Sequence, residues 1–240
     1  MNAGRHSSWP DGDHFPTSMN RTLVIMAKAP RPGSVKTRLT EKLPLEAVTE
    51  LYRCLLNDTI ALAQTLDHVE IAIMCPGSDV EDLSRAVAKT VPIVAQAGQG
   101  LAAGLASVFK HFATPGRQQV IAFNSDSPHL PASILQAAFG VLETCDLVVG
   151  PTHDGGYYLV GARASHPSLF NSAGMGTATA LEALLARARD LRLSVQLTDP
   201  FYDIDVAADL SQLADELQRA PARAPRTAKW LSDWASAAYE

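Results

Sequence analysis

The stretch TLVIMAKAPRPGSVKTRL, residues 22–39, decides the fold class of this chain. Residues 22–27 are apolar and have the length of a strand, and a polar segment follows them without a break. The pattern predicts a buried strand that ends in a loop, and open α/β sheets bind their ligands at such strand ends. Two prolines stiffen the loop, and Gly33 lets a ligand approach its backbone closely.

Basic residues gather in this loop, where Glu41 is the one acidic residue between positions 28 and 42. The whole chain has a formal net charge of −5, so the segment is a basic island in an acidic sequence. It indicates a local anion site, although a solvated charged loop gives the same pattern. Lys36 offers a point charge to phosphate oxygens, and Arg38 offers a planar fork. The basic residues are Lys28, Arg31, Lys36, Arg38 and Lys42.

The composition excludes several classes of protein. The 240 residues are 47% hydrophobic and 19% charged, which is ordinary for a soluble globular protein. A nucleic-acid-binding protein normally carries a basic excess, so the negative charge argues against that class. No apolar run reaches the roughly 18 residues that span a bilayer. Three cysteines without short spacing indicate a reduced, cytoplasmic protein, and nothing in the sequence fixes the oligomeric state.

Apolar runs of strand length alternate with segments of helical period, which predicts a layered α/β domain. We expect this domain at residues 20–219, after a disordered tail at residues 1–19. Residues 220–240 should form a Pro/Ala linker, over 220–226, and a helical tail that packs on the domain. Strands are expected at 22–27, 69–74, 92–95, 120–123, 146–149, 157–161 and 193–197. Helices are expected at 45–66, 78–90, 101–113, 177–190 and 206–219, and after Pro131.

A second polar motif, NSDSPHLP, occupies residues 124–131. Asp126 directly follows an apolar strand, so it should reach the same sheet edge as the basic loop. Magnesium often takes one or two carboxylates from a protein together with phosphate oxygens. The same aspartate is also suited to cap the next helix or brace the turn. No other histidine lies at metal-ligand spacing from His129, which we interpret as a turn residue.

Two further acidic motifs follow later strands. Asp154 precedes two glycines and two tyrosines, a group suited to line a polar pocket or to form a simple hairpin turn. Asp203 and Asp205 alternate along an extended segment, so their carboxylates should point the same way. Two like charges so close are costly without a cation. Asp205 is equally placed to cap the last helix.

The strings MAKAPRPGSVKTRL, NSDSPHLP, DGGYYLVG and YDIDVAADL occur in this order. The chain thereby resembles the glycosyltransferase-A-type family of arsenosugar-biosynthesis or selenodomain-associated transferases, over roughly residues 21–213. The resemblance implies a nucleotide-diphospho-sugar transferase (GT-A, Rossmann-like) fold, which is a three-layer αβα sandwich around a mainly parallel mixed sheet. It also implies Mg²⁺ or Mn²⁺ and a nucleotide-sugar or nucleoside-triphosphate substrate with a small-molecule acceptor.

The resemblance assigns roles to residues by position. Asp126 and Asp205 would be the metal ligands. Asp154 would lie on the acceptor side, where it is the candidate base or acceptor-orienting residue. Gln96 falls near the nucleobase. The catalytic candidates are Asp154 and Lys36, and the nucleotide-binding candidates are Ala27, Lys28, Gly33, Lys36, Arg38, Gln96 and Gly98.

The segment QAGQGLAAGL, residues 96–105, departs from the family pattern. Gly100 replaces the family's acidic residue, and Gly104 replaces its arginine. The KTRL and GLAAGL strings are also similar to phospholactate guanylyltransferases and molybdopterin nucleotidyltransferases. Three functions therefore stay open. They are metal-dependent hexosyl transfer from a nucleotide sugar to a small acceptor, guanylyltransferase-like nucleotidyl transfer to a phosphorylated small molecule with release of pyrophosphate, and nucleotide binding without catalysis.

Overall fold

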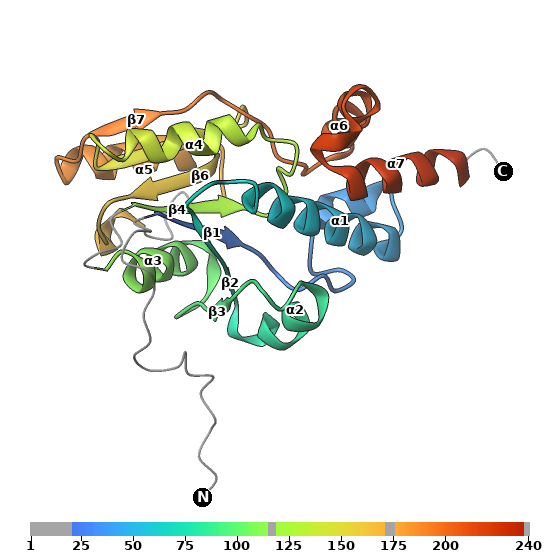
Figure 1. Cartoon of the computed structure of the whole chain (residues 1–240), viewed down its shortest axis with the longest axis horizontal. Coiled ribbons are helices and arrows are strands. Elements are labelled where there is room, and N and C mark those ends of the chain that lie inside the picture. The colour runs from blue at the N-terminus through green and yellow to red at the C-terminus, as the bar shows by residue number, and fades with distance from the viewer. Residues whose placement is uncertain (1–20, 115–118, 171–175, 238–240) are drawn as a thin grey trace, which may run out of the picture.

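The computed structural model describes residues 21–114, 119–170 and 176–237, so the tail expected at 1–19 lies outside the described residues. The described residues form a seven-stranded sheet between layers of helices (Figure 1). The strands are β1 Arg21–Met26, β2 Glu70–Cys75, β3 Ile93–Ala95, β4 Gln119–Asn124, β5 Leu147–Pro151, β6 Tyr157–Ala162 and β7 Val195–Leu197. The α-helices are α1 Leu45–Ala63, α2 Val80–Ala86, α3 Gly100–Phe112, α4 Ala132–Val141, α5 Ala180–Asp190, α6 Ala207–Arg219 and α7 Pro225–Ala237.

The strand order is β3-β2-β1-β4-β6-β5-β7, and β6 alone among these strands runs antiparallel to its neighbours. Each expected strand is present, with ends shifted by one or two residues. Short 3-10 helices complete the described chain, namely η1 Thr37–Glu41, η2 Gly77–Asp79, η3 Pro167–Leu169 and η4 Pro221–Arg223. This mainly parallel, mixed sheet confirms the predicted α/β class.

The pleat of β1 sends alternate side chains into the two helical layers. Leu23 and Ile25 belong to a buried cluster with residues of α1, α2 and α4. Val24 belongs to a second cluster with residues of α3 and α5 on the opposite face. Because both faces are covered, the central strands are continuously apolar rather than alternating. The three layers of the expected sandwich are therefore present.

A third, smaller cluster joins the C-terminal helices to α1 (Figure 1). The expected linker segment holds η4 and the start of α7, and Ala224 is completely buried there. Asp58 of α1 is also buried, and its carboxylate accepts hydrogen bonds from the N–H and the hydroxyl of Thr227, at 2.8 and 2.9 Å. Arg226 donates to the same carboxylate at 3.1 Å. Asp58 therefore caps α7 from a neighbouring helix.

Three local expectations were wrong. The spacing of Ser78 and Glu81 predicts a capping box, but the Ser78 hydroxyl donates to Asp79 and Glu81 pairs with Arg85. Helix α2 also ends at Ala86, short of the expected position 90. The helical period of residues 101–113 predicts Leu101 on the buried side, but this residue is 49% exposed because it lies at the first turn of α3 beside a cleft.

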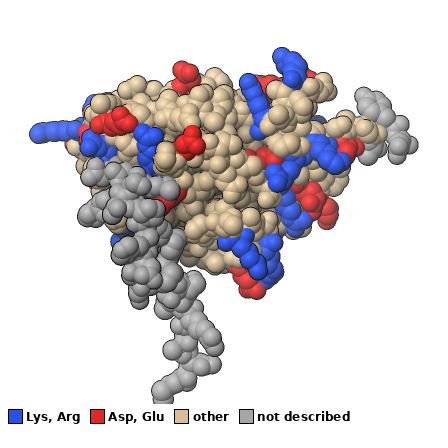
Figure 2. Space-filling view, in the orientation of Figure 1, with Lys and Arg blue, Asp and Glu red and all other residues tan. Residues whose placement is uncertain are grey.

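On the face drawn in Figure 2, basic side chains are interspersed with acidic ones. The described part of this face therefore has no broad basic surface of the kind that binds nucleic acid. Within the described ranges, every helix is too short or too polar to span a bilayer.

Candidate functional site

The carboxyl ends of four parallel strands meet at one edge of the sheet. Met26 at the end of β1 pairs with both Met74 and Asn124, and Cys75 pairs with Ala95. The loops that leave these strands surround a cleft of about 610 Å³. Seven of the predicted site residues line it, namely Ala27, Lys28, Lys36, Arg38, Gln96, Asp126 and Asp205.

Three predicted site residues do not line this cleft. Gly33 and Gly98 shape the loops instead, since each adopts a positive φ, of 75° and 82°. Asp154 lies in the turn between β5 and β6, a position described separately below. The cleft therefore joins the basic loop to the two predicted metal ligands, with the predicted acceptor residue outside it.

Lys36 occupies the centre of the charged cluster. Its backbone is left-handed, with φ 47° and ψ 43°, and its side chain is only 8% exposed. The ammonium forms an ion pair with Asp126 and lies 3.8 Å from Oδ1 of Asp205. Burial by itself lowers the pKa of Lys36, but attraction to Asp126 and two further carboxylates outweighs burial and raises the pKa. Lys36 is thus a buried, charged ammonium among carboxylates.

The segment around Ile204 brings the later acidic motif to Asp126. Ile204 is fully buried, and its N–H donates to the Asp126 carbonyl at 3.3 Å. The residues on either side, Asp203 and Asp205, both act on the Lys36 ammonium. Burial, together with repulsion from Asp126, raises the pKa of Asp203 to about 6. The alternation of acidic residues indicated this pair, although Asp205 was the one predicted metal ligand of the two.

Arg38 contacts a carboxylate as well. Its Nη1 atom lies 2.6 Å from Oδ2 of Asp205. The Arg38 side chain is 65% exposed, so most of its donors face solvent. Two residues predicted to bind phosphate thus pair, without a ligand, with the residues predicted to bind metal.

Tyr52 links the basic loop to the Asp126 loop, a role that no sequence motif indicated. This residue of α1 is 3% exposed, and its hydroxyl accepts a hydrogen bond from the Lys28 N–H at 3.2 Å. The same hydroxyl lies 2.9 Å from the hydroxyl of Ser125. Burial raises the pKa of Tyr52, so the phenol stays protonated. Helical periodicity marks Tyr52 only as one more inward-facing residue.

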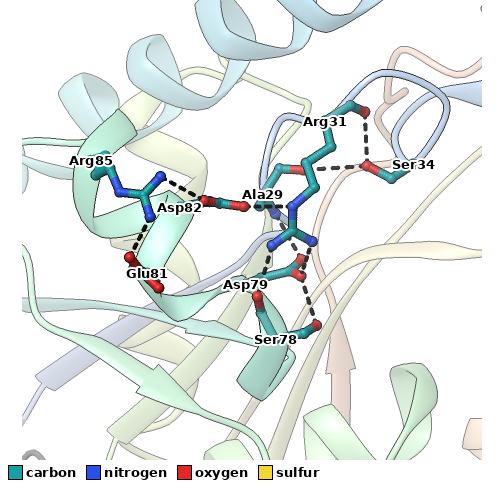
Figure 3. A network of polar contacts seen from close by, with 8 residues as sticks. All are labelled: Ala29, Arg31, Ser34, Ser78, Asp79, Glu81, Asp82 and Arg85. Atoms are coloured by element: carbon teal, nitrogen blue, oxygen red, sulfur yellow. Dashed lines mark hydrogen bonds and ion pairs between the residues drawn. The ribbon is translucent and has the colours of Figure 1, made fainter.

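Arg31 belongs to the basic segment but does not line the cleft. Figure 3 shows it turned toward η2 and α2, where it contacts Asp79 at 2.7 Å and Asp82 at 2.6 Å. Asp79 also accepts the Ala29 N–H at 2.8 Å. Burial raises the pKa of Asp79, but hydrogen bonds from Ala29, from its neighbouring serine and from Arg31 outweigh it and lower the pKa. Arg31 and Asp79 therefore anchor the loop.

Asp154 lies in the hairpin turn between β5 and β6. Its carboxylate accepts the Thr152 hydroxyl at 2.5 Å and the Gly156 N–H at 3.1 Å, and these bonds, the Thr152 bond first, lower its pKa. Attraction to Arg38 lowers that pKa a little further. Gly155 has φ 88°, and a Cβ there would meet the Ala178 carbonyl oxygen at 1.9 Å.

The tyrosines after this turn do not form the polar pocket that the sequence suggested. Tyr158 is 2% exposed, and its hydroxyl contacts Thr198 at 2.6 Å and donates to the Asp199 carbonyl at 3.0 Å. Tyr157 packs against the core cluster below α3 and α5. Burial raises the pKa of Tyr157 to about 12. Asp154 is therefore the polar group of this motif that remains for a ligand.

Gln96 holds the loop that precedes α3. Its Nε2 donates to the carbonyls of Gly98 and Gly100, at 3.1 and 3.2 Å. A Cβ on Gly104 would lie 2.7 Å from Oε1 of Gln96. Gly104 thus makes room for the Gln96 side chain.

The residues at this edge fit a hard divalent cation. Oδ1 of Asp126 is buried and has no hydrogen-bond partner. Carboxylate oxygens are the ligands that Mg²⁺ and Mn²⁺ prefer. Within the described ranges, no three acidic, histidine or cysteine side chains gather closely enough to hold a metal by themselves. Asp126 and Asp205 would therefore share the ion with oxygens of a bound phosphate.

His129, interpreted as a turn residue, is fully buried beside the charged loop. Its ring lies 4.8 Å from the ring of Phe201 and 4.5 Å from that of Tyr202, measured between centroids. Neither ring nitrogen has a hydrogen-bond partner. Burial lowers the pKa of His129 to about 4, so the ring is neutral and serves packing.

Comparison with known families finds a match over about half of the chain. The family described as "Uncharacterized protein conserved in bacteria (DUF2064)" matches residues 59–177. No curated protein matches the sequence.

Solved structures share the fold over most of the chain. A Desulfovibrio desulfuricans G20 protein, provisionally named a nucleotide-diphospho-sugar transferase, is 27% identical, with a TM-score of 0.82 over 89% of this chain and 94% of that one. The fold is nucleotide-diphospho-sugar transferase-like. The inositol-1-phosphate CTP transferase of T. maritima is 15% identical, with a TM-score of 0.57 over 83% and 95% of the two chains. The 4-diphosphocytidyl-2C-methyl-D-erythritol synthase of Anaerococcus prevotii is 11% identical, with a TM-score of 0.54 over 84% and 98%.

The last two likenesses are likenesses of fold alone, and both proteins are named for reactions of cytidine nucleotides. Proteins of this fold carry names from both classes of chemistry, and the fold by itself assigns neither to this chain.

Proposed function

We propose that this protein is a metal-dependent transferase that moves a hexosyl group from a nucleotide sugar to a hydroxyl of a small acceptor. One observation carries the proposal. Lys36 contacts Asp126 and approaches Asp205 in a cleft at the carboxyl ends of the parallel strands. Cations and carboxylates so placed are the parts that a diphosphate with a divalent ion requires.

The cleft offers separate regions for the parts of the donor. Lys28, Lys36 and Arg38 line it on the side of the basic loop and supply positive charge for the diphosphate. Leu101 and Gln96 line it at the start of α3, where an exposed apolar side chain suits a flat base. This arrangement supports a nucleotide with its phosphates toward Asp126.

Asp126 and Asp205 would hold the divalent ion, which when bound supplies positive charge to the departing diphosphate. Lys36 and Arg38 add positive charge on the same side of the cleft. Such preorganised charge stabilises the growing negative charge of the leaving group more effectively than water does.

The acceptor side is acidic, and this favours a hydroxyl acceptor over a phosphorylated one. Hydrogen bonds from Thr152 and Gly156 lower the pKa of Asp154, so it is ionised, and after burial and Asp126 its charge adds to the causes that raise the pKa of Asp203. Carboxylates so placed repel an incoming phosphate. An ionised Asp154 is suited instead to accept the proton of an attacking hydroxyl or to orient it.

Nucleotidyl transfer is the second candidate, because the fold is shared with two proteins named for reactions of cytidine nucleotides. The two reactions release different products. Hexosyl transfer releases a nucleoside diphosphate from a nucleotide sugar, whereas nucleotidyl transfer releases pyrophosphate from a nucleoside triphosphate.

The test is to incubate the protein with Mg²⁺ or Mn²⁺, a panel of nucleotide sugars and nucleoside triphosphates, and candidate acceptors. The phosphate product is identified by anion-exchange chromatography. We expect metal-dependent release of a nucleoside diphosphate, abolished in a folded Asp126→Ala variant. Release of pyrophosphate alone replaces the proposal with nucleotidyl transfer. If nucleotides raise the melting temperature but no product forms, the protein binds nucleotides without catalysis and the proposal is wrong.

A further inference from the structure

The cations predicted to bind phosphate and the carboxylates predicted to bind metal neutralise one another. Lys36 pairs with Asp126, and Arg38 pairs with Asp205 at 2.6 Å. Both pairs join the loop after β1 to segments more than eighty residues away in sequence. The charged cluster is thus internally paired before any ligand enters.

The Lys36 ammonium occupies the middle of this cluster. The Lys36 side chain is 8% exposed and that of Asp126 is 15% exposed, so water screens their attraction poorly. Lys36 is attracted to Asp203 and Asp205 as well. A lysine that pairs with Asp126 and lies 3.8 Å from Asp205 stands where a divalent ion ligated by those two carboxylates would stand.

We propose that Lys36 is a resident cation of this carboxylate cluster, and that a divalent ion binds tightly only when a nucleotide diphosphate draws the ammonium away. The inference rests on the proposed function and adds the order and coupling of ligand binding. Metal and nucleotide then strengthen each other's binding by the same factor, because binding coupling is reciprocal.

The loop is built so that a side-chain movement of Lys36 is sufficient. Upstream of Lys36, Asp79 fixes the backbone at Ala29 and the guanidinium of Arg31 (Figure 3). Downstream, Leu39 is completely buried in the cluster formed with α1 and α6. The four-carbon side chain of lysine is flexible, so the Lys36 ammonium can turn toward a phosphate while the contacts of Asp79 and the burial of Leu39 keep the loop backbone in place.

The left-handed backbone of Lys36 is a second indication. A non-glycine residue at φ 47° is uncommon, and such conformations gather at ligand clamps and switch regions. This conformation starts η1 and directs the chain past Asp126. The pairing of Lys36 with Asp126 is therefore set by the loop backbone as well as by charge.

The test measures Mn²⁺ binding, by paramagnetic resonance of the free ion, to the full chain without nucleotide. Wild type is compared with Lys36→Met and with Lys42→Met, which removes an exposed charge from the same segment. We expect Lys36→Met to bind Mn²⁺ at least tenfold more tightly than wild type, and Lys42→Met to match wild type. Adding Asp126→Asn to Lys36→Met should remove the gain. Circular dichroism checks each fold, and Lys36→Gln replaces Lys36→Met should the latter not fold.

A second arm repeats the Mn²⁺ titrations with saturating ADP, GDP, CDP or UDP. Wild type should then gain at least tenfold in Mn²⁺ affinity, and Lys36→Met should gain much less. Equal Mn²⁺ affinities for wild type and Lys36→Met without nucleotide overturn the inference. Failure of every nucleotide to bind would instead count against the proposed function, and the metal arm still decides the role of Lys36.

Discussion

The hydroxyl groups of Tyr52 and Ser125 lie 2.9 Å apart, and this contact ties helix α1 to the loop that carries Asp126. The same phenol accepts the Lys28 N–H at 3.2 Å. One side chain therefore sets the spacing between the basic loop and the loop that carries Asp126.

Replacing Tyr52 with Phe should loosen that spacing. Removing the hydroxyl leaves the Lys28 N–H and the Ser125 hydroxyl without this partner, at a cost of about 1–2 kcal/mol in unfolding free energy. We expect nucleotide affinity to fall severalfold, measured by calorimetry beside urea denaturation. Tyr158→Phe is the control, because its hydroxyl bonds to Thr198 and Asp199 away from the cleft. Equal nucleotide affinity in the two variants would show that Tyr52 serves stability alone.

Asp79→Ala should release the anchor of the basic loop. The change leaves Ala29 without its N–H partner and Arg31 with Asp82 as its remaining carboxylate. Loss of a buried, charged acceptor costs about 2–4 kcal/mol. We expect the urea midpoint to fall and nucleotide binding to weaken. The control is Glu81→Ala, on the exposed side of α2, which should change neither the urea midpoint nor nucleotide binding. If Asp79→Ala had the wild-type urea midpoint, Asp79 would not be the anchor of the basic loop.

Asp58→Ala should detach α7 from α1. Asp58 is 1% exposed and holds the first turn of α7 through Thr227 and Arg226. Because the donors lose a buried carboxylate, we expect destabilisation of about 3 kcal/mol. Hydrogen exchange should show early loss of protection in α7. Asp233→Ala, which removes an exposed pair with Lys229, should leave that protection unchanged.

His129 should make the protein less stable in mild acid. Its pKa is lowered from 6.5 to about 4 by burial, so between these values the unfolded chain binds a proton that the folded chain does not. The stability linked to this group is complete above pH 6.5 and is lost as the pH falls toward 4, by at most about 3 kcal/mol. The raised pKa of Asp203 acts in the opposite direction.

The check is urea unfolding of wild type and His129→Leu at several pH values from 4 to 7. The difference between the two proteins isolates the histidine from Asp203. We expect that difference to shift in favour of the variant as the pH falls. A difference that is independent of pH would mean that His129 is not held neutral.

Sequence patterns predicted much of this arrangement because they follow directly from strand geometry. The apolar run that ends at Ala27 predicted a central strand, and the rule for carboxyl ends placed Asp126 beside the basic loop. Alternation along an extended segment predicted that the carboxylates of Asp203 and Asp205 point the same way, and both attract the Lys36 ammonium. These inferences need only the alternation of residues along an extended segment and the position where a strand ends, and both are local properties of the sequence.

The remaining features depend on long-range contacts. Arg31 and Lys36 are both basic residues of the same loop, so the sequence did not distinguish them. Arg31 pairs with Asp79, which follows β2 and comes close to Arg31 because β2 lies beside β1 in the sheet. Tyr52 belongs to no motif, and the helical period of α1 shows only that it lies on the buried side of the helix. Leu101 was placed in the core by periodicity, although its helix begins beside the cleft. In each case the partner, rather than the pattern, decides the role.

Whether a diphosphate and a divalent ion bind together at Lys36 and Asp126 can be measured directly. Nucleoside diphosphates are titrated by calorimetry into wild type, Lys36→Ala and Asp126→Asn with Mg²⁺ present. If phosphate and metal meet at Lys36 and Asp126, each variant should bind at least tenfold more weakly than wild type while keeping its fold. Wild-type affinity in both variants would contradict the account and move the nucleotide elsewhere.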